Sequence, residues 1–193
     1  MDTATPNVTS ESGAQQTLRQ WNHERDEIQA RIRARGGKPG LASPAMTAGK
    51  TGLELMQAML TGELPYAHIA ETLDFTLVQV GPGTAVFQGT PQLKHYNPLG
   101  SVHGGWYATL LDSAVGCAVH TMMPVGRGYT TAELSINIVR AAFNTSGPLR
   151  AIGTVVHCGR QLATAEGRIV GPDGKLYAHA TTTCLVFELP TRG

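Results

Sequence analysis

The segment Asn97–Thr121 reads NPLGSVHGGWYATLLDSAVGCAVHT and dictates how the rest of the chain must be arranged. Turn-forming residues open the segment, and a run that is apolar or small on nearly every face follows. A helix that is apolar on most of its faces is a buried helix. We therefore expect a central helix here, covered by the other elements of the chain.

Asp112 lies in the middle of this apolar run and is its only acidic or basic residue between Gly100 and Met123. Aspartate is rarely fully buried without a partner, because an unpaired buried carboxylate is costly. Two interpretations stay open at this point. Asp112 either faces solvent or pairs with a distant arginine as a structural ion, or it is a functional carboxylate.

The residues His103, Gly104 and Gly105 mark the start of the expected helix. Two glycines are poor helix formers, but they allow a ligand to approach the bare backbone closely. The start of a helix also presents free N–H groups and the positive end of the helix dipole. This arrangement suits the binding of an oxyanion or a polarised carbonyl group.

Gly104 and Asp112 are too far apart on one helix to act on the same small group. A rise of about 1.5 Å per residue separates their backbones by roughly 12 Å, whereas hydrogen-bond reach is about 3 Å. Either the two residues do unrelated work, or a second copy of the helix brings its own Asp112 to this Gly104. A twofold axis would do so at both ends, which predicts an obligate dimer with shared sites.

The segments around the central helix alternate between apolar and polar residues with the period of a β-strand. The expected strands cover residues 73–80, 84–90, 130–142, 150–157, 162–170 and 176–187. Within residues 130–142, strict alternation places Ala132, Leu134 and Ile136 on one face and Thr131 on the other. A hairpin, a long helix and four more strands predict an α+β fold in which an antiparallel sheet wraps around the helix.

The chain before residue 50 forms an extension to this domain. Residues 1–12 are polar and expected to be disordered, and residues 13–49 are expected to form a helix, over Gly13–Ala34, and a linker. A short helix should then begin after Thr51, with Glu54 at the capping-box spacing, and end at Gly62. We expect the main domain to cover residues 50–188 and a C-terminal tail to cover 189–193.

Composition excludes several classes of function. Charged residues are 15% of the chain and the net charge is +1, which gives no overall case for nucleic acid or an anionic membrane. Arginines in the N-terminal helix leave a nucleic-acid arm open, but acidic residues between them favour a solvated helix packed on the body or on a neighbouring subunit. His103 and Asp112 make the apolar run a poor membrane span.

The three cysteines form no Cys-x-x-Cys pair, so neither structural zinc nor a disulfide framework is expected. We expect no metal and no cofactor. Buried thiols in a reducing compartment, together with the absence of a secretory signal pattern, predict a cytoplasmic protein.

Asn97, the His103-Gly104-Gly105 triplet and Asp112 together resemble the signature of the PaaI-like acyl-CoA thioesterases, which are hot-dog-fold members of the 4-hydroxybenzoyl-CoA thioesterase superfamily. The likeness extends from about residue 51 to residue 187. It implies a hot-dog fold and the hydrolysis of an aromatic or medium-chain acyl-CoA to a free acid and CoA. It also implies a homodimer that assembles to a homotetramer.

The resemblance assigns a role to each candidate catalytic residue. The Gly104 N–H would polarise the thioester carbonyl, and Asp112 of the opposite subunit would act as general base or as nucleophile. Asn97 would lie near the thioester and the attacking water, unless it only forms a turn before Pro98. His103 would anchor the start of the helix or transfer a proton, and the Thr131 hydroxyl would hold the water beside the aspartate, unless it is a strand threonine without a task.

Substrate-binding residues follow from the same resemblance. Gly105 and Trp106 would contribute to the acyl or CoA site, although Trp106 is equally suited to plain packing. His157, Gly159 and Arg160 match a family turn near the CoA phosphates, and an exposed β-turn is the open alternative.

Two other functions on the same fold remain as alternatives. A non-catalytic acyl-CoA sensor or regulator would not need Asn97, Gly104 and Asp112, which argues against it. A hot-dog hydratase or dehydratase would need a histidine and an acidic residue at a different spacing, which the sequence lacks.

Overall fold

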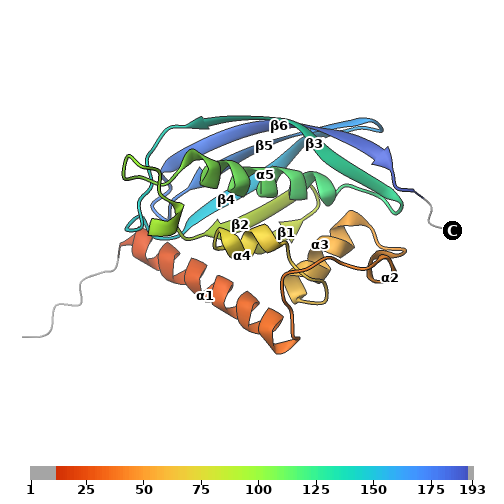
Figure 1. Ribbon diagram of the computed structural model, residues 1–193, viewed down its shortest axis with the longest axis horizontal. Helices are drawn as coiled ribbons and strands as arrows, with labels where there is room; N and C mark the ends of the chain where they lie inside the picture. The colour runs from red at the N-terminus through yellow and green to blue at the C-terminus, as the bar shows by residue number, and fades with distance from the viewer. Residues whose placement is uncertain (1–11, 191–193) are drawn as a thin grey trace, which may run out of the picture.

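A computed structural model describes residues 12–190 of the chain. An antiparallel sheet of six strands, in the order β1-β2-β4-β5-β6-β3, curves around the central helix α5 (Gly104–His120), as Figure 1 shows. The strands are β1 (Phe75–Gly81), β2 (Thr84–Gly89), β3 (Arg127–Ile138), β4 (Leu149–Cys158), β5 (Leu162–Val170) and β6 (Leu176–Glu188). The expected α+β fold is confirmed. Of the expected tails, residues 1–11 and 191–193 lie outside the described part of the chain.

Helix α5 packs directly against the backbone of the sheet because two strands carry glycine at the points of contact. A Cβ atom built at Gly153 of β4 would lie 2.2 Å from the carbonyl oxygen of Ala114. One built at Gly167 of β5 would lie 2.7 Å from Cγ1 of Val115. Any larger residue at these positions would push the helix away from the sheet, so the glycines set the depth at which α5 is buried.

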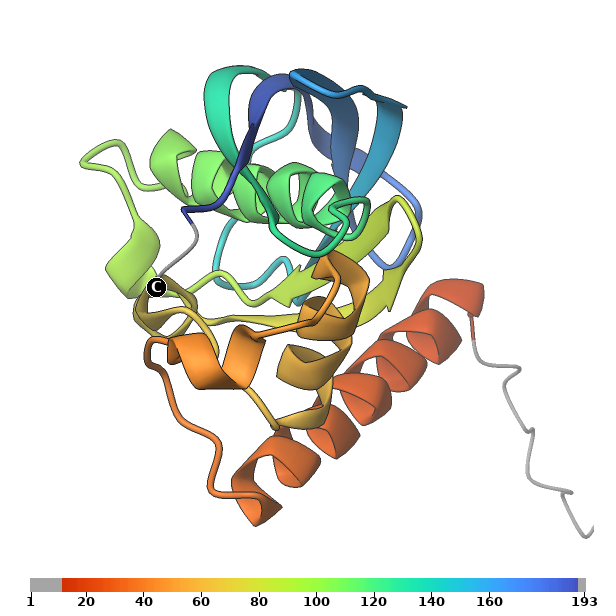
Figure 2. The same ribbon diagram turned by 90° about the vertical axis from the view of Figure 1, so that its right-hand side faces the viewer.

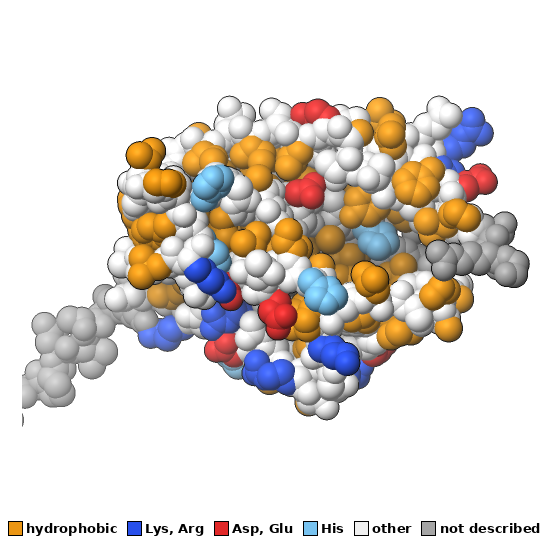
Figure 3. Space-filling model, viewed as in Figure 1, with side chains coloured by type: hydrophobic (Ala, Val, Ile, Leu, Met, Phe, Trp, Pro, Cys, Tyr) orange, Lys and Arg blue, Asp and Glu red, His pale blue; other side chains and the backbone are white. Residues whose placement is uncertain are grey.

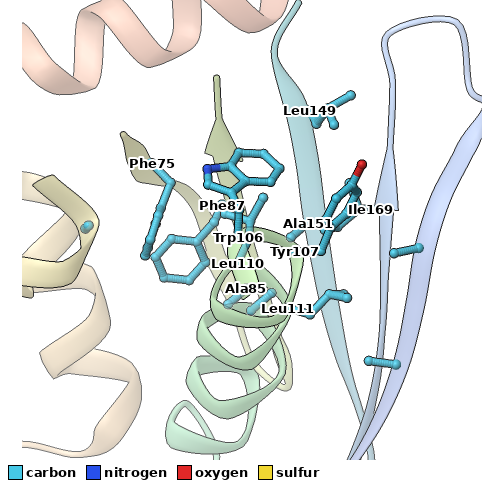
Figure 4. Close-up of a cluster of buried hydrophobic side chains, with 14 of the residues drawn as sticks. Phe75, Ala85, Phe87, Trp106, Tyr107, Leu110, Leu111, Leu149, Ala151 and Ile169 are labelled. Atoms are coloured by element: carbon cyan, nitrogen blue, oxygen red, sulfur yellow. The ribbon is translucent and has the colours of Figure 1, made fainter. Parts of the chain in front are cut away.

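The main core lies between α5 and the inner face of the sheet. Phe75 and Phe87 pack edge to face, with ring centroids 5.7 Å apart and an interplanar angle of 76°. Figure 4 shows these rings beside Trp106 and Leu110 of α5. Each fully buried side chain of this size stabilises the fold by about 1.5–3 kcal/mol. The apolar faces of α5 therefore account for its central position.

Strand β3 contains a bulge that corrects the alternation expected from the sequence. Thr131 pairs with Cys184 and Glu133 pairs with Thr183, which leaves Ala132 as the extra residue. The bulge places Thr131 toward α5, where its hydroxyl contacts Asp112. Leu134 packs against the same core. The prediction that Thr131 and Leu134 face opposite ways was wrong, because a bulge shifts the side-chain period by one residue.

Helix α3 (Gly52–Thr61) begins and ends as its sequence predicts. The Thr51 Oγ1 accepts from the Glu54 N–H at 3.3 Å, and the Thr51 N–H donates to the Glu54 carboxylate at 2.7 Å. Gly62 follows in the left-handed conformation with φ 79°. The capping box and the terminal glycine are therefore confirmed.

Helix α1 (Gly13–Ala34) crosses the outer face of the sheet, on the side opposite α5, as Figures 1 and 2 show. Ile28 and Ile32 pack with Val78 and Val86 in a separate apolar cluster. Of the two alternatives left open by the sequence, packing on the body of the same protomer is the one observed.

A polar contact fixes the first half of α1 on the sheet. The buried Arg150 guanidinium of β4 donates to the Glu24 carboxylate at 2.7 Å and to Gln88 Oε1 at 3.0 Å. It also lies over the Trp21 ring, 4.6 Å from its centroid. The guanidinium therefore ties α1 to two adjacent strands.

Three short elements were not expected from the sequence: α2 (Pro44–Thr47), α4 (His68–Thr72) and the 3-10 helix η1 (Leu93–His95). Each is too short to display a helical repeat of apolar residues. Within residues 12–190, no helix combines the length and apolar character needed to cross a bilayer.

Candidate active site

The start of α5 presents a free backbone donor. His103 is the N-cap, and its Nδ1 accepts from the Gly105 N–H at 2.8 Å. The His103 N–H donates to the His95 carbonyl at 2.8 Å, which fixes the approach of the chain to the helix. Within residues 12–190, the Gly104 N–H has no hydrogen-bond partner. His103 thus anchors the helix start and leaves the neighbouring amide available.

Asn97 lies beside this amide and organises the turn in front of the helix. Its Oδ1 accepts from the N–H groups of Leu99 at 2.9 Å and Ser101 at 3.3 Å. Its Nδ2 donates to Ser101 Oγ at 3.2 Å. Asn97 and Gly104 line the same hollow, which has a volume of about 330 Å³. The turn-forming role is therefore present, and the same residue contributes with Gly104 to the wall of this hollow.

Asp112 is half-buried on α5 and receives a hydrogen bond from Thr131. The Thr131 Oγ1 lies 3.0 Å from Asp112 Oδ1. No lysine or arginine forms an ion pair with Asp112 in the part of the chain that the structure describes. The carboxylate is therefore positioned by a neutral hydroxyl and is not neutralised by a cation, which rules out the structural ion pair within residues 12–190.

The thiols and the phenol closest to Asp112 are unsuited to act as nucleophiles or bases. Burial, together with the Asp112 carboxylate, raises the pKa of Cys117 to about 12. Burial also raises the pKa of the Tyr129 hydroxyl well above its ordinary value, and the pKa of Cys184 is raised for the same reason. Since a thiol attacks as its thiolate, these raised pKa values leave the two cysteines poorly suited to nucleophilic attack at neutral pH.

Gly104 and Asp112 do not meet within one protomer. They lie eight positions apart on the unbroken helix α5, so about 12 Å separates their backbones along the axis. The structure therefore keeps the alternatives that the sequence defined, namely unrelated roles or a site completed by a second copy.

The structure places Trp106 in the core. The ring is 3% exposed, its Nε1–H donates to the Leu73 carbonyl at 3.0 Å, and it stacks on His95. It does not line the hollow that Asn97 and Gly104 share. Plain packing, one of the two interpretations of this residue, accounts for its position, and Gly105 serves as the partner of the His103 imidazole.

His157, Gly159 and Arg160 lie at the turn between β4 and β5, some distance from Asp112. The Gly159 N–H donates to the Leu162 carbonyl at 2.8 Å, and the side chains of His157 and Arg160 are exposed. Two strands, β5 and β6, lie between β4 and the strand β3 that carries Thr131. The guanidinium of Arg127, the first residue of β3, donates to the Arg160 carbonyl of the turn.

A second, larger hollow of about 580 Å³ was not expected from the sequence. Ser113 and Cys117 of α5 form part of its wall, as do Gln29 of α1 and Gln88 of β2. The one sequence feature that pointed to this hollow is the polar Gln88 in the strand segment AVFQG. Alternation assigns this position to the outer face of the strand, which is buried under α1. Among residues 12–190, no group of three or more His, Cys, Asp and Glu side chains is arranged to hold a metal ion.

Comparisons with known proteins show which family the chain resembles. The family model for the thioesterase superfamily matches residues 99–178. A protein of Halobacterium salinarum, named provisionally as an esterase, is 39% identical over 75 residues, which are 38% of this chain and 48% of that protein. The chain thus spans about half the length of this curated relative.

Two solved structures show the likeness over longer stretches. A protein of Ralstonia eutropha JMP134, described as related to phenylacetic acid degradation and provisionally as a thioesterase, is 30% identical, with a TM-score of 0.62, over 67% of this chain and 98% of its own. The PaaI protein from the phenylacetic acid degradation operon of E. coli is 21% identical, with a TM-score of 0.62, over 72% of this chain and 100% of its own, and supports the fold. The fold, the family model and the Ralstonia relative together show that the chain belongs to the thioesterase superfamily of hot-dog-fold proteins.

Proposed function

We propose that the protein is an acyl-CoA thioesterase that hydrolyses an aromatic or medium-chain acyl-CoA to the free acid and CoA. The observation that carries this proposal is the presence of two groups on helix α5. Asp112 receives a hydrogen bond from the Thr131 hydroxyl, and the helix begins with the unpartnered Gly104 N–H. A carboxylate without a neutralising cation and a free amide at a helix start are the two groups that thioester hydrolysis requires. The name of the Ralstonia relative points to phenylacetic acid degradation, which favours the aromatic class.

In this mechanism, the thioester carbonyl oxygen accepts a hydrogen bond from the Gly104 N–H. The amide and the positive end of the α5 dipole stabilise the oxyanion, and one such donor typically lowers the barrier by roughly 3–4 kcal/mol. Asp112 of the partner subunit either removes a proton from the attacking water or attacks the carbonyl itself. In both cases the tetrahedral adduct collapses with cleavage of the C–S bond, and CoA leaves as its thiolate and takes up a proton. If Asp112 is the nucleophile, water then cleaves the acyl-aspartyl anhydride to give the free acid. The Thr131 hydroxyl orients the carboxylate, and Asn97 lies where it can contact the thioester or the water.

A dimer with shared sites is part of the proposal. The outer edge of β3 has no partner strand among the described residues, and Ile138 and Val139 at its end are 47% and 57% exposed. An open edge with apolar side chains favours pairing with another chain. Figure 3 shows hydrophobic side chains spread over α5 and β3 on the same face. Antiparallel pairing of β3 with its copy would place the two α5 helices side by side in opposite directions.

Assembly of two such dimers to a homotetramer is a further step of the proposal. The outer face of β4, β5 and β6, which α1 leaves uncovered, carries exposed apolar side chains: Val156, Leu162, Leu185 and Phe187. Sedimentation velocity should give a tetramer for the wild type. The Leu185→Lys substitution should give an active dimer.

The CoA moiety would extend from the site toward the β4–β5 turn. His157 and Arg160 are exposed there and can approach the phosphates of CoA, whereas Gly159 leaves the backbone open. Arg160→Ala should raise KM several-fold and leave kcat unchanged, because the residue lies far from the reacting bond.

The experiment that tests the proposal measures thiol release from a panel of acyl-CoA thioesters. Asp112→Asn should lower kcat by about 10²–10⁴-fold while acyl-CoA binding persists, because general acid–base catalysis contributes about that much. Asp173→Asn, in the exposed β5–β6 turn, is the matched control and should behave as wild type. If the wild type bound acyl-CoA and hydrolysed none of the panel, the protein would be a non-catalytic acyl-CoA-binding protein.

A further inference from the structure

The backbone in front of α5 is held by a residue that the proposed mechanism does not use, His95. Its carbonyl oxygen accepts from the His103 N–H at 2.8 Å. The Gly104 N–H belongs to the next peptide unit, which is planar and can turn only about the two backbone torsions of His103. The direction in which the Gly104 N–H points therefore depends on how firmly the His95 carbonyl is held.

The His95 side chain fixes the backbone of its own turn. Its Nδ1 accepts from the Gln92 N–H at 3.1 Å and so closes the 3-10 turn η1. The ring is buried, with 1% of the side chain exposed, and it stacks on the Trp106 ring of α5 with centroids 5.9 Å apart and an interplanar angle of 28°. One imidazole thus connects the turn before the helix with the first turn of the helix itself.

The other ring nitrogen of His95 faces a carboxylate. Because Nδ1 accepts a hydrogen bond, we place the proton of the neutral ring on Nε2, which lies 3.3 Å from Asp74 Oδ2. Burial lowers the pKa of His95 more than Asp74 raises it, so the ring is neutral at neutral pH. Neither Nε2 nor Oδ2 makes a hydrogen bond to another group within residues 12–190. The carboxylate therefore orients the ring through its Nε2–H.

Asp74 is itself held in place by the same group of contacts. The preceding residue, Leu73, accepts the Trp106 Nε1–H at 3.0 Å, and the Asp74 carbonyl accepts from the Thr90 N–H at 3.2 Å. With φ at 54°, Asp74 is the one non-glycine residue with a positive φ in the part of the chain that the structure describes. Such a conformation persists where the surrounding contacts over-determine it. Leu73 and Asp74 thus hold both rings of the stack.

We propose that His95, oriented by Asp74, is a positioning residue for thioester hydrolysis that fixes the direction of the Gly104 N–H. This role rests on the proposed function, in which that N–H polarises the thioester carbonyl. An apolar side chain of similar size would fill the same space, but it would supply neither an acceptor for the Gln92 N–H nor a donor to Asp74. Both residues of the pair precede residue 99, where the match to the family model begins.

Steady-state kinetics with the acyl-CoA that the wild type hydrolyses best separate positioning from packing. His95→Leu nearly keeps the volume of the side chain and removes both ring nitrogens. We expect kcat to fall about tenfold or more with KM within about twofold of the wild type, because complete loss of an oxyanion donor costs about 10²–10³-fold in kcat. His95→Asn keeps an acceptor near the position of Nδ1 and should recover part of kcat. Lys94→Gln, which removes the exposed ion pair with Asp74, is the matched control and should keep the wild-type values.

A second measurement needs no turnover. An acyl-dethia-CoA, in which a methylene group replaces the sulfur, keeps the carbonyl and cannot be hydrolysed, whereas an S-alkyl-CoA of the same chain length lacks the carbonyl. Calorimetry should show that the wild type binds the ketone more tightly than the thioether. His95→Leu should lose most of this difference, and Lys94→Gln should retain it.

The outcomes separate the positioning role from the proposed function. Wild-type kcat in His95→Leu, or equal affinity of the wild type for the two analogues, would overturn the positioning role and leave the thioesterase proposal intact. If His95→Leu did not fold, Asp74→Gly would decide, because glycine adopts the left-handed conformation without strain. That variant should lower kcat at unchanged KM, and wild-type kcat would contradict the role. If the wild type hydrolysed no thioester, the thioesterase proposal would fail, and the two analogues would still decide whether His95 directs the Gly104 N–H.

Discussion

The Thr131 hydroxyl is the polar partner that the structure gives to Asp112, which makes it a sharp test of the site. Thr131→Val keeps the β-branched shape and removes the 3.0 Å hydrogen bond. We expect kcat for acyl-CoA hydrolysis to fall about tenfold or more, because a hydrogen bond to a charged group contributes about 1.5–3 kcal/mol. Thiol release at saturating substrate measures the effect.

The control for this prediction is Thr131→Ser, which retains the hydroxyl and should recover most of the lost turnover. Melting temperatures of both variants show whether the strand is intact. A Thr131→Val enzyme with wild-type kcat would mean that the hydroxyl has no part in holding the carboxylate in its reactive position.

Two histidines, the buried His95 and the half-buried His120, should make the free energy of unfolding depend on pH. Burial lowers the pKa of His95 and of His120 from the ordinary value of 6.5. The unfolded chain therefore binds more protons than the folded chain below about pH 6.5, and the stability present above this pH is lost as the pH falls through it. The slope reaches at most about 1.4 kcal/mol per pH unit for each histidine.

Urea denaturation between pH 8 and pH 5.5 measures this dependence. His120→Gln should flatten the decrease in unfolding free energy toward low pH. His68→Gln, at an exposed position on α4, is the control and should follow the wild-type curve. An increase in stability from pH 7 to pH 5.5 would contradict the assignment.

At the scale of elements, the charged contact between Glu24 and Arg150 helps to hold α1 on the sheet. Glu24→Ala removes the carboxylate that pairs with the buried Arg150 guanidinium at 2.7 Å. We expect the unfolding free energy to fall by about 1–3 kcal/mol, because a buried cation loses its partner while Glu24 itself is partly exposed. Amide hydrogen exchange in α1 should quicken more than in α5.

Glu27→Ala provides the matched control for α1. Glu27 lies on the same helix but forms only a long, exposed contact with His23 at 3.8 Å. Its removal should change the unfolding free energy by less than about 0.5 kcal/mol. Equal effects of the two substitutions would show that Arg150 does not hold the helix.

The elements that could be predicted from the sequence are those whose signals are local. The capping box of Thr51 and Glu54 and the apolar repeat of α1 involve residues a few positions apart, so the pattern contains the whole interaction. The contact between Glu24 and Arg150 joins residues 126 positions apart and has no local signature. For the same reason the hollow under α1 could not be predicted, since elements far apart in the chain, α1, β1, β2 and α5, contribute to its wall.

The candidate site was predictable to the same extent. The positions of Gly104 at the start of the helix and of Asp112 within it follow from the apolar run alone. The orientation of Thr131 does not, because one bulged residue in β3 reverses the face that alternation assigns to it. Such a bulge depends on pairing with β6, which lies about fifty residues further along the chain.

At the scale of the whole molecule, the separation between Gly104 and Asp112 leads to a test with mixed subunits. Gly104→Pro removes the amide donor at the first helical position, where proline is well tolerated. Asp112→Asn removes the carboxylate. If each site combines Gly104 of one subunit with Asp112 of the other, a hybrid dimer retains one intact site and one doubly damaged site. Each variant alone has none.

Co-expressed in equal amounts with two different affinity tags, both in the Leu185→Lys background that limits assembly to dimers, the variants should therefore form hybrid dimers with about half of the turnover per dimer of Leu185→Lys alone, because isologous pairing builds two equivalent sites. Tandem purification isolates the hybrids. As a control for the added side chain, Gly104→Ala, which keeps the N–H, takes the place of Gly104→Pro in the same experiment. If the hybrids were as inactive as their parents, no site would combine Gly104 of one subunit with Asp112 of the other. Because the unbroken helix α5 keeps its two ends at a fixed separation, such a result would mean that Gly104 and Asp112 do not act on the same thioester.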